Sequence, residues 1–226
     1  MRLSNNHQKL ITSLSQKKYR QKHQLFIAEG VKVVRELLES SFELEIIFST
    51  ESEFSSLDCF IQVSDQELKK ISSLKTPNKV LALFKIPLQK KVNSSGLIVV
   101  LDTINDPGNL GTIIRLCDWF GVAQIICSKD TVDSFNQKVV QASMGSLSRV
   151  KLNYCNLQTE LSLMKDYSII SKDMDGVDVK ESVDVDKKVI VLGNEGNGIS
   201  KEVLQLSNIT MSINKSNNSE AESLNV

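Results

Sequence analysis

The chain has 226 residues, of which 41% are hydrophobic and 24% are charged, and its formal net charge is zero. These values are typical of folded globular proteins and exclude a wholly disordered chain. The longest apolar runs fall far short of the roughly 20 residues that cross a bilayer, and residues 1–9 lack the pattern of a secretory signal. We therefore expect one or two folded domains and a location in the cytoplasm.

The cysteines and histidines exclude several kinds of catalytic and metal site. Cys59, Cys117, Cys127 and Cys155 are widely spaced, and no Cys-x-x-Cys pair suggests zinc binding or redox chemistry, so we expect four free thiols. Both histidines lie within the first 23 residues, which argues against a histidine-based triad or a multi-histidine metal site. No metal is expected.

Positive and negative charges are unevenly distributed along the chain. Residues 1–95 carry 15 Lys and Arg against 10 Asp and Glu, whereas residues 96–226 carry 12 against 17. Residues 1–23 contain six basic residues and no acidic one, a pattern that suits a phosphate backbone. The candidate nucleic-acid contacts are Lys17, Lys18, Arg20 and Lys22. The alternative is an ordinary solvated helix face.

Residues 1–88 alternate between helical and extended patterns and predict a small α/β domain. Ser64 or Asp65 can cap a helix that continues through Leu68 and Ile71. The other predicted helices are 6–16 and the segment from Val31 to Leu38, and the predicted strands are 25–27, 44–48, 60–63 and 80–84. The polar stretch that follows, residues 89–96, is the predicted linker.

Residues 97–226 contain strands that alternate with helices, which predicts a parallel sheet with helices on its faces. The expected strands are 97–101, 123–127, 167–170 and 189–192, and the expected helices are 109–120, 136–144 and 200–206. We expect Asp173–Asp186 to form an exposed loop or hairpin. Ligands of such sheets bind beyond the carboxyl ends of the strands.

The first segment that can carry chemistry follows the strand ending at Leu101. Pro107-Gly108 predicts a tight turn, and Asn109 can cap the next helix with its side-chain oxygen. Arg115 lies beside apolar residues, where its guanidinium can hold a phosphate through two parallel hydrogen bonds. A half-exposed arginine with no ligand is the alternative.

Two further segments are uninformative when each is taken alone. Val189–Leu192 is followed by Gly193-Asn194-Glu195-Gly196-Asn197-Gly198, whose backbone groups suit a small cofactor. The glycine spacing fits neither a dinucleotide fingerprint nor a phosphate-binding loop of the Walker type, which excludes a nicotinamide-dependent oxidoreductase. The last segment runs from Ile209 to Ile213 and ends in Glu222-Ser223-Leu224-Asn225-Val226.

In this order and spacing, the three segments resemble the three motifs of the SpoU-type RNA ribose 2′-O-methyltransferases of the SPOUT superfamily. Val139–Leu147 resembles a further segment of that family, and residues 1–88 are similar to the smaller RNA-binding domain that many members carry in front. The resemblance implies an α/β catalytic domain over residues 97–226, with a parallel sheet and a C-terminal trefoil knot. It also implies a homodimer and S-adenosylmethionine as the cofactor.

The resemblance assigns roles to individual residues. The matching catalytic positions are Asn109, Arg115, Glu195, Ser223 and Asn225. The matching cofactor positions are Leu192, Gly193, Ile213 and Leu224. Arg115 either clamps the phosphate beside the target ribose or acts as the base, and its very high ordinary pKa favours the clamp.

The chain departs from the family pattern in its last segment. Family members usually show Ile-Pro-Met and a glycine soon after, whereas this chain reads Ile213-Asn214-Lys215 and stops at Val226. The expected activity is methylation of a ribose 2′-hydroxyl in ribosomal RNA. Transfer RNA is the alternative substrate, and an RNA-binding protein without catalysis is the alternative class.

Overall fold

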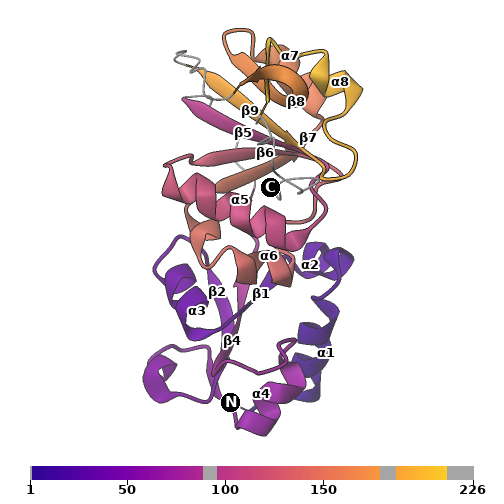
Figure 1. Cartoon of the computed structure of the whole chain (residues 1–226). Helices are drawn as coiled ribbons and strands as arrows, with labels where there is room; N and C mark the ends of the chain where they lie inside the picture. Colours follow the sequence, from indigo (N-terminus) through magenta and orange to yellow (C-terminus); the bar gives the residue numbers. More distant parts are fainter. Residues whose placement is uncertain (1, 89–95, 179–186, 213–226) are drawn as a thin grey trace, which may run out of the picture. The chain divides into compact units, whose positions relative to one another are not determined.

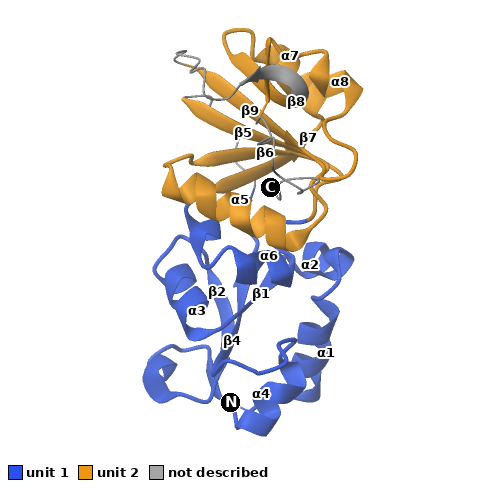
Figure 2. Ribbon diagram, in the orientation of Figure 1, with its two compact units in different colours: residues 1–89, 133–149 blue, residues 90–132, 150–226 orange. Residues whose placement is uncertain are grey.

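Two β-sheets organise the chain, one in each of two units (Figures 1 and 2). The computed structural model describes residues 2–88, 96–178 and 187–212. Unit 1 consists of residues 1–89 together with 133–149, and unit 2 consists of residues 90–132 together with 150–226. None of the helices in the described part of the chain is both long and apolar enough to span a membrane.

The sheet of unit 1 has four strands in the order β1-β4-β2-β3. β4 is antiparallel to both of its neighbours, and β2 and β3 are parallel. The strands are β1 (Leu25–Glu29), β2 (Leu44–Ser49), β3 (Phe60–Gln62) and β4 (Val80–Lys85). All four strands predicted for this part of the chain are therefore confirmed, to within two residues at their ends.

Helices cover the sheet of unit 1. One face packs apolar side chains from β1, β2, β3 and β4 against α1 (Asn5–Ser13) and α4 (Asp65–Ile71). Ser64 caps α4, as predicted, and it exchanges hydrogen bonds with Glu67 in a capping box. The remaining helical elements are α2 (Lys17–His23), α3 (Val31–Leu38), η1 (Ser52–Phe54), α6 (Gln137–Ala142) and η2 (Ser146–Ser148).

Residues 133–149 take part in the core of unit 1 although they follow three elements of unit 2 in the sequence. The ring of Phe135 lies 4.8 Å from that of Phe26 on β1 and 6.3 Å from that of Phe42. α6 contacts β1, and the Gln137 amide donates a hydrogen bond to the buried carboxylate of Glu29. Unit 1 is therefore assembled from two stretches of the chain.

Unit 2 contains a six-stranded sheet in which every pair of neighbouring strands is parallel, in the order β10-β8-β9-β5-β6-β7. The α/β class and the parallel sheet predicted from the sequence are thus confirmed. The strands are β5 (Leu97–Asp102), β6 (Gln124–Ser128), β7 (Lys151–Cys155), β8 (Ser168–Asp178), β9 (Lys188–Gly193) and β10 (Ile209–Ser212). The helices are α5 (Pro107–Trp119), α7 (Leu157–Leu163) and α8 (Lys201–Leu204).

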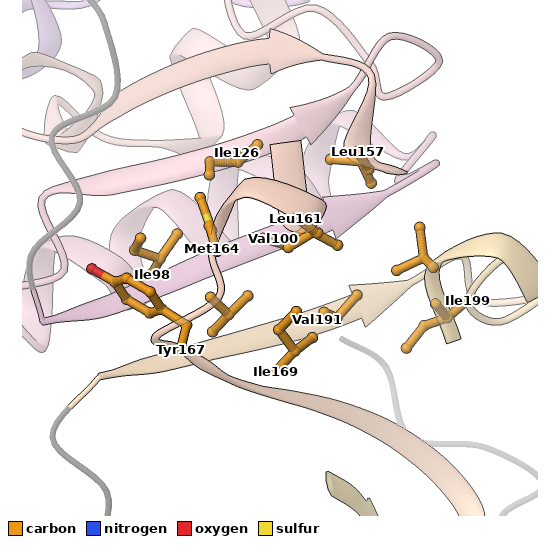
Figure 3. Close-up of a cluster of buried hydrophobic side chains, with 12 residues drawn as sticks. Ile98, Val100, Ile126, Leu157, Leu161, Met164, Tyr167, Ile169, Val191 and Ile199 are labelled. Carbon is orange, nitrogen blue, oxygen red and sulfur yellow. The ribbon is translucent and has the colours of Figure 1, made fainter. Parts of the chain in front are cut away.

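Apolar side chains on one face of this sheet pack against α7 and α8 (Figure 3). Ile98, Val100, Ile126, Ile169 and Val191 come from the strands and meet Leu157 and Leu161 of α7. α5 lies on the opposite side of the sheet (Figure 1). Because both faces are covered, the central strands β5 and β9 carry continuous apolar runs.

Two expectations for unit 2 need correction or fall outside the described residues. β8 continues to Asp178, so the first part of the segment expected to be a loop or hairpin is strand. In this part of β8, Val177 and Asp178 pair in parallel with Met211 and Ser212 of β10. The predicted trefoil knot involves residues 213–226, which lie outside the described residues.

Candidate functional site

The carboxyl ends of β5 and β9 are adjacent, because Asp102 pairs with Gly193 in the parallel register. β5 leads into α5, and β9 leads into the loop Asn194–Gly198. The first two candidate segments, which are separated by about 80 residues in the sequence, therefore meet at one edge of the sheet of unit 2.

Asn109 and Glu195 are brought together at this edge. The Nδ2 of Asn109 donates a hydrogen bond to the Oε1 of Glu195. Asn109 is half-buried and Glu195 is exposed, so the carboxylate keeps further lone pairs toward solvent. The structure thus joins two of the five residues assigned to catalysis.

The expectation that Asn109 caps α5 is wrong. The helix begins two residues earlier, at Pro107, and the N-cap is Asp106, whose carboxylate accepts a 2.8 Å hydrogen bond from the Asn109 amide N–H. Proline is favoured at the first helical position because its missing N–H has no helical partner there. The cap at Asp106 leaves the Asn109 side chain available to bond Glu195.

Arg115 is exposed on α5 and forms no ion pair or hydrogen bond with any residue in the described ranges. It lies six positions after Asn109 on the helix, which turns the two side chains about 120° apart around the helix axis. The side chains of Arg115 and Asn109 therefore point in different directions. A free, exposed guanidinium is suited to binding a phosphate from outside the chain.

The loop after β9 is held in a tight turn by Asn194. Its Oδ1 accepts hydrogen bonds from the backbone N–H groups of Gly196 and Asn197, at 2.9 and 3.0 Å. Its Nδ2 donates a 3.0 Å hydrogen bond to the carbonyl of Thr103. The backbones of Asn194 and Gly198 pair with each other in both directions. Asn194 therefore ties the second segment to the first.

Thr103 has a backbone conformation that β-branched residues rarely adopt, with φ of +61°. Its N–H donates a 2.9 Å hydrogen bond to the hydroxyl of Ser128 on β6, and its carbonyl accepts from Asn194. The adjacent Asp102 is buried, and its carboxylate accepts a 2.8 Å hydrogen bond from the Ser200 N–H. Strained backbone of this kind tends to occur at functional sites.

Thr103, Asn194 and Asp102 are not among the site residues predicted from the sequence. Asn194 lies between Gly193 and Glu195, both of which were predicted, so an amide inside a glycine loop could have indicated a loop-closing side chain. No sequence signal indicates the positive φ of Thr103.

The predicted cofactor residues lie partly within the described chain. Leu192 and Gly193 are half-buried at the carboxyl end of β9. A Cβ atom at Gly193 would lie 2.4 Å from the backbone carbon of Gly198, so only glycine fits there. Ile213 and Leu224, and the catalytic candidates Ser223 and Asn225, lie outside the described residues.

The basic candidates lie in unit 1, on α2. Lys17, Lys18 and Lys22 are exposed, as expected for residues that contact nucleic acid. Arg20 is buried, and its side chain bonds Asp133 and the backbone carbonyls of Leu14 and Ser15. The prediction that Arg20 contacts RNA is therefore corrected, because its guanidinium is already used inside the unit.

The four cysteines are free thiols, as predicted. Burial raises the pKa of Cys117 to about 12, and burial also raises the pKa of Cys59, Cys127 and Cys155. These thiols stay protonated at neutral pH and are poor nucleophiles.

Comparison with known proteins finds a matching family model for each of two parts of the chain. Residues 96–226 match the family model described as the SpoU rRNA methylase family, and residues 5–82 match a model described as an MRM3-like substrate binding domain. The chain is 27% identical to the 23S rRNA (guanosine(2553)-2′-O)-methyltransferase RlmP of Bacillus subtilis. That alignment covers 94% of this chain and 88% of the relative.

Solved structures agree with the family match. A protein from Porphyromonas gingivalis, described as an RNA methyltransferase of the TrmH family, is 33% identical with a TM-score of 0.91. It matches over 100% of this chain and 94% of its own. An AdoMet-bound rRNA methyltransferase from Sinorhizobium meliloti is 26% identical with a TM-score of 0.87, over 99% of this chain and 90% of its own.

Proposed function

The chain belongs to the SpoU rRNA methylase family, and on that basis we propose that it transfers the methyl group of S-adenosylmethionine to a ribose 2′-hydroxyl of ribosomal RNA. The observation that carries the proposal is the hydrogen bond between Asn109 and Glu195. It joins two of the family's motifs at the carboxyl edge of the parallel sheet, where such folds bind their ligands. The cytoplasmic location expected from the sequence is kept as part of this proposal.

The described part of the site fits a cofactor that is held mainly through backbone groups. Leu192 and Gly193 are only half-buried at the end of β9 and carry no charge, and the loop beyond them is closed by Asn194. When bound, S-adenosylmethionine supplies an activated methyl group on its sulfonium. Ile213 and Leu224 are proposed as the remaining cofactor contacts.

The residues of the chain must hold the RNA and manage the proton of the attacking hydroxyl. A ribose hydroxyl is a poor nucleophile until its proton is removed and its oxygen is positioned in line with the methyl group. We assign Arg115 to the phosphate beside the target ribose, because its guanidinium is exposed and has no partner among the described residues. A guanidinium stays protonated in proteins and is therefore a poor base.

Glu195 orients Asn109, whose amide would otherwise rotate freely. The exposed oxygens of Glu195 remain able to accept a hydrogen bond from the substrate. We also propose that the hydroxyl of Ser223 and the amide of Asn225 complete the catalytic site.

A homodimer is proposed from the surface of α5. Leu116, Trp119 and Phe120 have exposed fractions of 49%, 85% and 73%, which is unusual for large apolar side chains so close together. They lie beside Arg115 in the sequence. A second copy of unit 2 covering this face would bury the apolar side chains and direct Arg115 toward the partner's site.

The test is transfer of labelled methyl groups from S-adenosylmethionine to ribosomal RNA and, in parallel, to transfer RNA. We expect Arg115→Ala to lower kcat/KM for ribosomal RNA about a hundredfold, the loss typical of a misplaced substrate. Arg115→Lys should retain part of the rate, because lysine keeps the charge but not the planar fork. Lys201→Ala, an exposed lysine on α8, is the matched control.

The results of these transfer assays distinguish the proposed function from its alternatives. Wild-type rates in both Arg115 variants would remove Arg115 from the mechanism. Transfer to transfer RNA alone would replace the proposed substrate. Absence of both cofactor binding by calorimetry and methyl transfer would show an RNA-binding protein that does not catalyse the reaction.

A further inference from the structure

α2 exposes aromatic and cationic side chains in two adjacent stripes. The rings of Tyr19 and His23, one helical turn apart, stack with centroids 6.5 Å apart and planes inclined by 23°. The Nζ of Lys18 lies 4.8 Å from the centre of the Tyr19 ring. His23, Lys18 and Lys22 are exposed, and Tyr19 is partly exposed.

Arg20 fixes which face of α2 meets solvent. Its guanidinium is held by Asp133 at 2.6 Å and by the carbonyls of Leu14 and Ser15, each at 2.9 Å. At about 100° per residue, Lys18 and Lys22 then point almost directly away from the core, and Tyr19 and His23 lie beside them. The buried arginine thus holds the two stripes in a defined orientation.

No acidic residue close in the sequence competes with RNA phosphates for the lysines of this face. Residues 1–23 contain no Asp or Glu, and neither Lys18 nor Lys22 forms an ion pair with any residue that the structure describes. The segment also lies inside the match to a substrate binding domain, at residues 5–82.

From this arrangement we infer that Tyr19 and His23 form a platform on which an unpaired base of the RNA substrate stacks, while Lys18 and Lys22 contact the neighbouring phosphates. Unpaired nucleotides are recognised in this way, because every base offers an aromatic face and each linkage carries one negative charge. A duplex keeps its bases stacked inside the helix and can use only the lysines. The inference rests on the proposed function in so far as the ligand is RNA.

The experiment measures binding of the full chain to a labelled, unstructured oligoribonucleotide and to an RNA duplex of the same length, by fluorescence anisotropy without cofactor. We expect Tyr19→Leu to weaken binding of the single strand about tenfold, a loss in the range found for one stacked base. Duplex binding should not change. Tyr19→Phe, which keeps the ring, should bind both RNAs like the unaltered protein, and this shows that the fold tolerates replacement.

The lysines provide an independent readout. Lys18→Gln with Lys22→Gln should weaken binding of both RNAs and reduce the slope of log affinity against log salt by roughly 1.5 to 2. Lys9→Gln, an exposed lysine on α1, is the matched control and should leave binding almost unchanged.

The proposed stacking platform would be overturned if Tyr19→Leu bound the single-stranded RNA as tightly as the unaltered protein. It would also be overturned if this variant lost the same affinity for the single strand and for the duplex. Unchanged affinity in the lysine double variant would overturn the phosphate contacts. These binding results do not depend on methyl transfer, so a protein that binds as expected but transfers no methyl group would contradict the proposed function alone.

Discussion

Arg20 and Lys18 lie two residues apart on α2, yet one is buried and the other is exposed. A buried guanidinium is costly unless its donors are satisfied, and here Asp133 and two backbone carbonyls accept from it. Asp133 comes from the distant stretch of unit 1. The pair therefore connects the two stretches from which that unit is built.

Replacement of Arg20 should destabilise the protein strongly. In Arg20→Ala, Asp133 is left largely buried without its partner, and removing one member of such a pair costs about 3 to 5 kcal/mol. Urea unfolding followed by circular dichroism measures the loss. Lys17→Ala is the control and should change the free energy of unfolding by less than about 0.5 kcal/mol. A similar small effect in Arg20→Ala would contradict the structural role assigned to this residue.

The loop after β9 shows how one element constrains the site. At Gly193 a side chain would meet the backbone of Gly198 at 2.4 Å, whereas at Gly196 it would only reach the Asn194 side chain at an ordinary 3.5 Å. The two glycines are three residues apart but tolerate substitution differently.

Gly193→Ala is expected to open the pairing of Asn194 with Gly198 and to weaken S-adenosylmethionine binding by at least about tenfold, because backbone atoms cannot move aside as flexible side chains can. Calorimetry measures the affinity, and a thermal melt shows whether the rest of unit 2 stays folded. Gly196→Ala should bind the cofactor normally. If both variants bound equally well, the closed form of the loop would not be required for binding.

At the level of elements, the sequence predicted those that carry a continuous apolar run or a clear helix cap. β5 and β9 read as continuous apolar runs, and α4 begins at its capping box, so their positions followed from pattern alone. β7 and α2 were missed because Lys151–Cys155 is only partly buried and Lys17–His23 is mostly polar, which leaves little periodicity to detect.

The resemblance to the family assigned both Asn109 and Glu195 to the catalytic site, and the structure shows a hydrogen bond between their side chains. Pattern could not show that Asp106 caps α5, since several residues in that turn are good caps. It also could not show that Arg20 is buried, because burial depends on an aspartate 113 positions further along the chain.

For the whole molecule, the proposed dimer explains both the exposed apolar surface of α5 and the direction of Arg115. Trp119→Asp should place a charge in the centre of the contact and leave the isolated subunit folded, because the Trp119 side chain is 85% exposed. We expect light scattering to show a monomer for this variant and a dimer for the unaltered protein. A monomer in both cases would contradict the dimer, and a dimer that persists in Trp119→Asp would place the contact elsewhere.

Unit 1 draws on residues 1–89 and 133–149, so the chain passes between the two units three times. Transfer of residues 1–88 alone to another protein would move β1 to β4 without Phe135, without Gln137 and without the aspartate that pairs with Arg20. The guanidinium of Arg20 and the buried carboxylate of Glu29 would each lose a partner, and the Phe26 ring would lose a neighbour. A graft of unit 1 therefore has to include residues 133–149 as well as the front of the chain.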